Sequence, residues 1–287
     1  WLIGKPYDVD ALPAEIAAFE AWKKDKSRPL PEVPFEWLTS FDLTTKQWAK
    51  LADRMGWQAL RMNLNTLARQ GAFQVKGVTD QVANRLGDKG AMARVRPMPY
   101  QLMTALTQVG DGVPLAVQAA LETALETSVA KVPKLKGYVV VCPDVSGSMQ
   151  SPATGYRKGA TSVVRCIDVA ALVAASVLRT NKRARVMPFA ERVKDVKLDP
   201  YARLAVNAEK LAGMWGGGTN VSAPLAKLNR ERAKVDTVVI VSDNQSWIDS
   251  NYYGPTQVMK EWKQLKARNP GAKLICIRFG GRLFSAA

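Results

Sequence analysis

The spacing of apolar positions differs between the two halves of the chain. In the first half, apolar residues recur every three or four positions within segments that end at Gly or Pro, a pattern typical of amphipathic helices. The predicted helices are 46–55, 57–70, 78–86, 100–108 and 115–130. Because short helices joined by tight turns bury their apolar faces only against neighbouring helices, this half is predicted to form HEAT-like helical repeats.

From Tyr138 onward, β-rich runs alternate with amphipathic helices. The predicted strands are 138–142, 185–189, 192–196, 237–241 and 273–277, and the predicted helices are 160–179, one starting at Ala202, 221–232 and 256–267. This alternation predicts a doubly wound, mostly parallel sheet with helices on both faces. We therefore expect an α + α/β protein with two domains, residues 1–135 and residues 136–287.

The composition excludes several classes of site. The chain has no histidine, which excludes Ser-His-Asp catalysis, Cys-His catalysis and His-ligated zinc. Cys142, Cys166 and Cys276 are widely spaced, which favours reduced thiols over a disulfide. No segment approaches the roughly 18 apolar residues that a membrane span requires. We expect a cytoplasmic protein without a membrane partner, and a segment preceding Trp1 because the chain does not begin with Met.

The net charge of +16 is unevenly distributed. Up to Leu135 there are 17 Lys and Arg against 14 Asp and Glu, a net charge of +3, whereas from Lys136 onward 24 against 11 give +13. Such an excess is typical of proteins that bind RNA or another polyanion. Charged helix faces are also commonly just solvated, so the charge alone leaves both interpretations open.

Oxygen-bearing side chains follow two of the predicted strands. Asp144, Ser146 and Ser148 come directly after the first, Asp243 lies two residues after the run 237–241, and Thr219 lies in a Gly-rich turn. The ends of parallel strands meet at one edge of a sheet, and hydroxyl and carboxylate oxygens suit Mg²⁺ or Mn²⁺. A metal site is therefore predicted there. The simpler alternative is a strand-to-helix turn with an N-cap serine.

These three segments resemble the metal-ion-dependent adhesion site of von Willebrand factor A domains. The resemblance implies that Ser146, Ser148 and Thr219 donate hydroxyl oxygens to Mg²⁺ or Mn²⁺, while Asp144 and Asp243 act directly or through water. With so few carboxylates around a divalent ion, the site stays electropositive and keeps a position for an external anion, such as an acidic protein ligand.

Helical repeats followed by such an A domain resemble the Ro autoantigen family of TROVE-domain RNA-binding proteins, above all its bacterial members. The segments that carry this resemblance are 34–39, 60–71, 99–102, 216–222 and 241–247. The similarity covers nearly the whole chain, with only the C-terminal part of the family's helical ring present.

The resemblance implies a ribonucleoprotein component that binds small non-coding (Y) RNA and the single-stranded ends of misfolded RNA. A 3′ exoribonuclease such as polynucleotide phosphorylase is a further expected partner. The candidate RNA contacts are Arg54, Arg61, Arg69, Arg94 and Arg96.

Two other functions compete with RNA binding. The first is a protein-docking module that binds an acidic partner through the metal site without RNA. The second is an enzyme, since the Asp144 loop superficially resembles a D-x-D phosphotransferase motif. Ser146 stands where the second carboxylate would act as acid or base, so no catalytic residue is expected.

Overall fold

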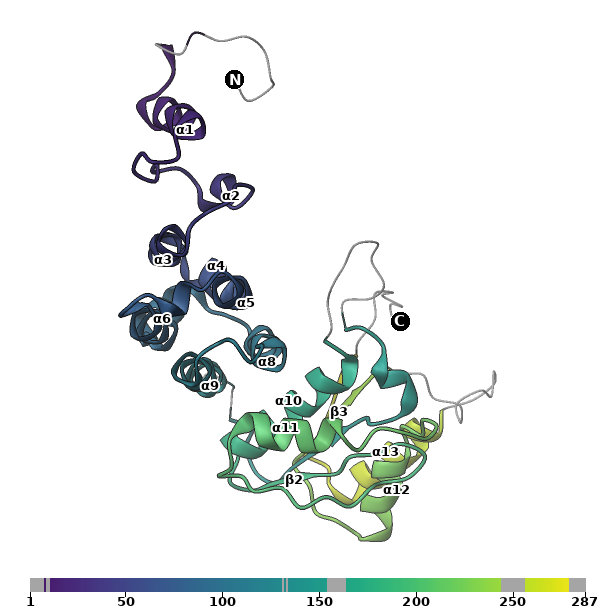
Figure 1. Ribbon diagram of the computed structural model, residues 1–287. Coiled ribbons are helices and arrows are strands. Elements are labelled where there is room, and N and C mark those ends of the chain that lie inside the picture. Colours follow the sequence, from purple (N-terminus) through teal and green to yellow (C-terminus); the bar gives the residue numbers. More distant parts are fainter. Residues whose placement is uncertain are drawn as a thin grey trace. The chain divides into compact units, whose positions relative to one another are not determined.

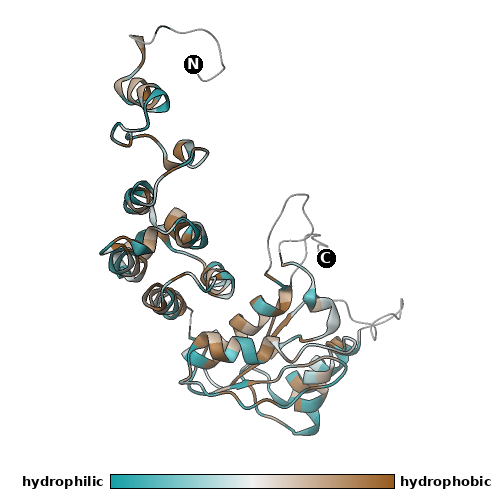
Figure 2. Ribbon diagram, viewed as in Figure 1, coloured by the Kyte–Doolittle hydropathy of each residue, from teal (hydrophilic) through white to brown (hydrophobic). Residues whose placement is uncertain are grey.

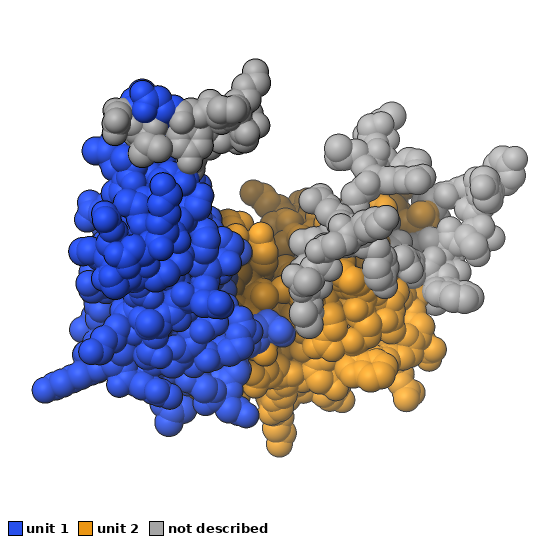
Figure 3. Space-filling model, turned by 45° about the horizontal axis from the view of Figure 1, so that its top comes forward, with its two compact units in different colours: residues 1–95, 108–121 blue, residues 96–107, 122–287 orange. Residues whose placement is uncertain are grey.

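The computed structural model describes residue 8, residues 11–130, residue 132, and residues 134–153, 164–243 and 256–278. The chain divides into two compact units, one of residues 1–95 and 108–121 and the other of residues 96–107 and 122–287 (Figure 3). The domain boundary expected between residues 135 and 136 stays a prediction.

Helices fill the described chain up to residue 129 (Figure 1). They are α1 (Ala14–Lys24), α2 (Phe35–Leu38), α3 (Thr45–Arg54), α4 (Trp57–Met62), α5 (Leu64–Arg69), the 3-10 helix η2 (Ala72–Gln74), α6 (Val78–Gly87), α7 (Lys89–Val95), α8 (Pro99–Gln108) and α9 (Leu115–Val129). Figure 2 shows apolar and polar residues mixed along these helices. The predicted helical half is confirmed, although the ranges predicted from the sequence do not include α1, α2, η2 or α7.

Helix α3 shows how the local sequence sets a helix boundary. The Thr44 hydroxyl accepts a hydrogen bond from the Gln47 backbone N–H at 3.3 Å, and the Gln47 side chain accepts one from the Thr44 N–H at 2.9 Å. This capping box satisfies donors that the first turn leaves open. Trp48 and Leu51 then form part of the buried face of the helix.

The single helix predicted over 57–70 is wrong, because Asn63 divides it into α4 and α5. The Asn63 backbone departs from helical values, with φ −103° and ψ 8°. Its side-chain amide donates to the Ala59 carbonyl at 2.9 Å. That carbonyl also accepts the Asn63 backbone N–H at 3.0 Å, so the side chain shares an acceptor of the helix, and such local bonds are why Asn favours turns and helix ends.

The second unit is built on a parallel sheet. Its strands are β1 (Val139–Pro143), β2 (Ala184–Val186), β3 (Thr237–Ser242) and β4 (Lys273–Arg278), in the order β2-β1-β3-β4. All three strand pairs are parallel. The helices are α10 (Cys166–Thr180), α11 (Leu204–Ala212), α12 (Ala223–Arg230) and α13 (Gln257–Arg268), and a 3-10 helix, η3 (Gly147–Gln150), follows β1.

Helices cover both faces of this sheet. Val140 and Ile240 belong to the buried cluster formed with Leu228 of α12 and Leu265 of α13. Helix α10 contacts β1, β2 and β3, and α11 packs on α10, on the other side of the sheet (Figure 1). β1 and β3 are fully buried apolar runs, as expected for central strands of a parallel sheet. The predicted α + α/β fold is therefore confirmed.

The strand predicted over 192–196 is absent. This segment makes only an isolated antiparallel bridge between Phe189 and Val193, and the strand predicted over 185–189 shortens to β2. The bonds to the β1 side continue past Pro188, because the Met187 and Phe189 N–H groups donate to the Val141 and Pro143 carbonyls at 2.9 and 3.0 Å. Pro188 lacks a backbone N–H toward the open edge of the sheet, so it cannot donate to residues 192–196, and the chain turns back with the Ala190 N–H donating to the Arg192 carbonyl at 3.1 Å.

Helix α10 begins at Cys166, and residues 160–163 of the longer predicted helix lie outside the described residues.

Within the part of the chain that the structure describes, none of the helices combines the length and apolar character needed to traverse a bilayer.

Candidate metal centre

Asp144 and Asp243 follow adjacent strands at one edge of the sheet. β1 and β3 pair in a register that sets Pro143 beside Val241, and the Asp144 N–H donates to the Val241 carbonyl at 2.8 Å. Asp144 begins the loop after β1, and Asp243 directly follows the last residue of β3. The strand pairing thus places the two carboxylates at the carboxyl edge of the sheet, where α/β folds bind ligands.

Asp144 organises the loop that follows it. Its side chain is fully buried. One carboxylate oxygen accepts the Ser146 N–H at 2.8 Å, and the other accepts the Ser242 hydroxyl at 2.5 Å. Burial raises the pKa of Asp144, the hydrogen bonds from Ser146 and Ser242 oppose that rise, and the nearby Asp243 charge adds to it. Asp144 therefore holds the loop in shape while Asp243 lies close enough to act on it electrostatically.

The hydroxyls of Ser146 and Ser148 converge. Their oxygen atoms lie 3.2 Å apart. Adjacent ligands of an octahedral Mg²⁺ with Mg–O bonds of about 2.1 Å are about 3.0 Å apart. Ser146 is buried and Ser148 is partly exposed. The pair therefore has nearly the spacing that one such ion requires.

A glycine-rich loop brings Thr219 to the same edge. The Gly147 N–H donates to the Gly217 carbonyl and the Gly216 N–H to the Val145 carbonyl, each at 3.0 Å. Gly216 and Gly217 have φ values of +132° and +88°, which side chains other than glycine rarely adopt. These bonds join the loop of Thr219, which is 5% exposed, to the loop of the serines.

Lys194 fixes the beginning of the glycine-rich loop. Its ammonium group donates to the Met214 carbonyl at 2.7 Å and to the Gly216 carbonyl at 3.1 Å. Lys194 lies in the segment predicted as a strand, so the sequence pattern does not reveal this role.

The donor set fits a hard divalent ion. The edge combines three hydroxyls with two carboxylates, the chemistry that Mg²⁺ and Mn²⁺ prefer over softer metals. Among the described residues, no group of three or more His, Cys, Asp or Glu side chains could hold a metal. An ion bound at this edge would therefore depend on Ser146, Ser148 and Thr219 as much as on its carboxylates.

The cysteines are free thiols, as the sequence predicts. Cys142 and Cys166 are buried and Cys276 is exposed. Burial raises the pKa of Cys166 to about 11, and the Asp243 charge contributes to the rise. A thiol with such a pKa is protonated at neutral pH, so Cys166 is a poor nucleophile despite lying beside the loop of Ser148.

The candidate RNA-contacting arginines differ in their surroundings. The Arg54 guanidinium donates to the carbonyls of Pro31 at 2.8 Å and Leu30 at 3.3 Å, which favours a structural role. Arg61 donates to the Gln58 side chain at 3.1 Å, and Arg69 to the Thr66 hydroxyl at 3.4 Å. Their role in RNA binding stays a prediction.

The remaining two candidates belong to different units. Arg94 and Arg96 are both exposed. Arg94 lies in the first unit with Arg54, Arg61 and Arg69, and Arg96 lies in the second.

The structure adds a cluster beside the serine loop that the sequence pattern does not reveal. Arg165 forms a two-pronged pair with Asp168, at 2.6 Å and 3.0 Å, and donates to the Gln150 side chain at 2.8 Å. Asp168 also accepts the Arg165 backbone N–H at the start of α10. The spacing of Arg165 and Asp168 is the only sequence signal for this pair, and it resembles an ordinary helix start.

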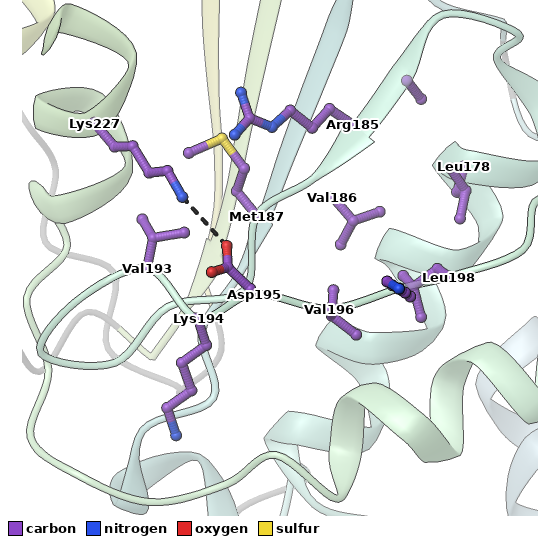
Figure 4. A pocket seen from close by; sticks show the side chains of 12 residues that line it. Leu178, Arg185, Val186, Met187, Val193, Lys194, Asp195, Val196, Leu198 and Lys227 are labelled. Carbon is purple, nitrogen blue, oxygen red and sulfur yellow. Dashed lines mark hydrogen bonds and ion pairs between the residues drawn. The ribbon is translucent and has the colours of Figure 1, made fainter. Parts of the chain in front are cut away.

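A cavity of about 580 Å³ lies along β2 and the segment 193–198 (Figure 4). In it Lys227 pairs with Asp195 at 3.4 Å. Arg185 pairs with Glu231 at 2.6 Å. Asp195 and Glu231 are thus each paired with a basic residue that lines the cavity.

Comparisons with known proteins match both halves of the chain. The family model described as "Ro60 vWA domain" matches residues 138–287. RNA-binding protein RO60 of Deinococcus radiodurans is 29% identical over 241 residues, which are 79% of this chain and 44% of that protein.

A solved structure shows the same fold. The crystal structure of the Deinococcus radiodurans RO (RSR) protein aligns with a TM-score of 0.60 and 24% identity, covering 91% of this chain and 52% of that one. The chain thus spans about half the length of these relatives. Because the family model covers more than half of its residues, the chain belongs to the Ro60 family.

Proposed function

We propose that this protein binds RNA and that its A domain docks an acidic group at a divalent metal ion. The observation that carries RNA binding is the match to RNA-binding protein RO60, which extends over 79% of the chain and so includes helical residues as well as the A domain. The net charge of +16 supports it, because Lys and Arg side chains that neutralise phosphates release counterions.

The proposed RNA ligands are small non-coding, Y-like RNA and the single-stranded ends of misfolded RNA. A 3′ exoribonuclease such as polynucleotide phosphorylase is the proposed partner that would act on such ends. Both proposals concern the activity of the longer relatives, of which this chain spans about half.

The proposed metal is Mg²⁺ or Mn²⁺, held by Ser146, Ser148 and Thr219 with Asp144 and Asp243. The 3.2 Å separation of the two serine hydroxyls supports this assignment. The bound ion would supply positive charge for an external carboxylate. Asp144 keeps the loop in place through the Ser146 N–H and the Ser242 hydroxyl, and the partly exposed Ser148 marks the side from which a ligand enters.

We propose binding without turnover. Both Asp144 oxygens accept hydrogen bonds within the protein, and the chain has no histidine to serve as a neutral-pH base. Labelled single-stranded RNA incubated with the protein and Mg²⁺ should therefore stay intact. Cleavage that disappears on Asp144→Ala would contradict this part of the proposal.

The test of RNA binding is ultraviolet crosslinking in cells, followed by sequencing of the RNA recovered with the protein. We expect enrichment of structured small RNA and of RNA with free 3′ ends. Recovery no greater than for an unrelated protein of similar charge would overturn RNA binding and leave the protein-docking module as the function.

The test of the metal site is calorimetric titration with Mg²⁺ and Mn²⁺. Ser148→Ala should abolish binding without unfolding the protein, because Ser148 is partly exposed and its hydroxyl is a proposed ligand. Ser151→Ala is the matched control, since it removes a hydroxyl from the same loop outside the ligand set and should bind like wild type. Equal metal affinity in all three proteins would refute the assignment.

A further inference from the structure

A small cavity of about 230 Å³ lies beside the candidate metal centre. All residues that line it belong to the second unit. Met103 of α8 and Ala208 and Ala212 of α11 contribute apolar surface, together with Trp215. The paired side chains of Arg165 and Asp168 form part of its polar lining, with Thr107 and Glu209.

Two connections place this cavity next to the metal loop. The Arg165 guanidinium donates to Gln150 at 2.8 Å, and Gln150 lies two residues after Ser148, a separation of at most about 7 Å along the chain. Trp215 immediately precedes Gly216, whose N–H donates to the Val145 carbonyl at 3.0 Å. The cavity and the proposed metal ligands are thus within reach of one short segment of a partner.

Trp215 indicates that the cavity binds a ligand. Its side chain is 58% exposed although tryptophan is among the residues that gain most from burial. Partly exposed aromatic residues beside a pocket are typical anchors of binding interfaces. Pockets for drug-sized ligands have volumes of about 300–1,000 Å³. This cavity is smaller, so it suits one bulky side chain.

The charges beside the cavity favour a protein over a nucleic acid. Glu209 lines the cavity, and Glu191 accepts the Gly218 N–H at 3.1 Å in the neighbouring glycine-rich loop. These carboxylates would repel a chain that carries a phosphate at every unit. A protein segment needs only one carboxylate, which binds the metal. The net charge of +13 from Lys136 onward attracts such a segment from a distance.

We propose that the cavity is the specificity subsite of the metal centre and that its ligand is an extended, acidic protein segment. One Asp or Glu of this segment binds the metal, and a Phe, Leu or Met two positions away enters the cavity against Trp215. Residues two apart in an extended chain lie on the same side, about 6.6 Å apart, so one side chain can reach the metal loop while the other reaches the cavity beside it. This inference rests on the proposed metal-dependent docking.

The test uses the full chain and two labelled peptides, measured by fluorescence anisotropy with Mg²⁺ or with EDTA. The peptides are Gly-Phe-Gly-Asp-Gly-Phe-Gly and Gly-Ala-Gly-Asp-Gly-Ala-Gly, whose symmetry allows either chain direction. We expect the Phe peptide to bind about tenfold more tightly than the Ala peptide, only with Mg²⁺, and not to the Ser148→Ala variant.

Two variants change the cavity in opposite ways. Trp215→Ala removes its exposed wall, and Gly213→Leu fills its mouth. Gly213 has a right-handed helical backbone, with φ −72° and ψ −11°, and its nearest neighbour to an added Cβ is at 3.4 Å, so a side chain is tolerated. Both variants should lose the preference for Phe and keep the Mg²⁺-dependent affinity for the Ala peptide. Tyr201→Ala, which removes an aromatic ring that is 89% exposed, is the control and should behave like wild type.

Each outcome distinguishes the subsite from the metal centre. If neither peptide binds with Mg²⁺, both the docking site and the subsite are refuted. If both bind equally and depend on Mg²⁺ and Ser148, the metal centre stands and the subsite is wrong. If Trp215→Ala instead weakens the Mg²⁺-dependent binding of oligouridylate, the cavity serves RNA and the protein ligand is wrong.

Discussion

Asp144 and Ser148, at the edge of the sheet, differ in burial and in bonding. Asp144 is buried and engaged at both oxygens, whereas Ser148 stays partly exposed. The carboxylate shapes the loop, and the hydroxyls of Ser146 and Ser148 lie 3.2 Å apart at the edge where we propose that the ion binds. Backbone conformation also depends on single residues here, because Gly137, Gly216 and Gly217 have positive φ values.

Gly137 is a residue whose replacement should be costly. It has φ +79°, and a Cβ there would lie 2.1 Å from an Asp236 carboxylate oxygen that accepts the Tyr138 N–H at 2.6 Å. Gly137→Ala should lower the free energy of unfolding by about 2–3 kcal/mol through left-handed strain and the displaced hydrogen bond. Urea denaturation measures the loss. Gly271→Ala, which meets no atom within 4 Å, is the control and should be nearly neutral.

Helix α9 contributes to both compact units. Its residues up to Leu121 belong to the first unit, and those from Glu122 onward belong to the second. Glu126 accepts the Leu204 N–H at the start of α11 at 2.8 Å and pairs with Arg179 of α10 at 3.2 Å. No side chain of α11 itself caps that helix, so Glu126 supplies the missing acceptor.

Removing this acceptor should destabilise the second unit. We expect Glu126→Ala to lower the free energy of unfolding by about 1–2 kcal/mol, because the α11 N-terminus and Arg179 both lose a partner. Thermal or urea denaturation provides the measurement. Glu122→Ala removes only an ion pair to Arg203, whose side chain is 70% exposed, and should cost less than about 1 kcal/mol. Equal effects of the two substitutions would show that Glu126 is not a cap.

The chain as a whole presents two separable binding activities under the functions proposed above. RNA contacts are predicted on the helical part, and the metal edge lies in the second unit. The charge complicates this division, because the helical half carries a net +3 and the rest +13. Long-range attraction of RNA can therefore come from residues other than the specific contacts.

Arg61 and Arg69 test the predicted division. In the full chain, Arg61→Gln with Arg69→Gln should weaken binding of RNA with a free 3′ end. It should also reduce the slope of log K against log salt by about 1.4, since each phosphate contact in single-stranded RNA contributes about 0.7. Filter binding across a salt series measures both effects. Ser148→Ala should leave the affinity and slope unchanged, and an unchanged slope in the arginine variant would locate the RNA contacts elsewhere.

Much of the fold and the candidate site follows from local sequence. The runs 138–142 and 237–241 predict β1 and β3 because central parallel strands are continuously apolar. The ligand candidates follow from their positions after those runs. Sequence reasoning failed where competing local signals meet, as at Asn63, whose side chain shares a backbone acceptor, and at Pro188, which has no N–H to donate to residues 192–196.

Sequence alone determined the helical half, the parallel α/β half, the kinds of oxygen donor and the absence of histidine chemistry, because each depends on residue type and on periodicity along the chain. Only the tertiary structure decided that Ser242 and Asp144 bond across two strands and that the glycine-rich loop joins the serine loop. It also decided that α8, α10, α11 and Trp215 enclose a cavity beside them. These contacts join residues far apart in the chain, so their distances depend on how strands pair and helices pack, which no local pattern records.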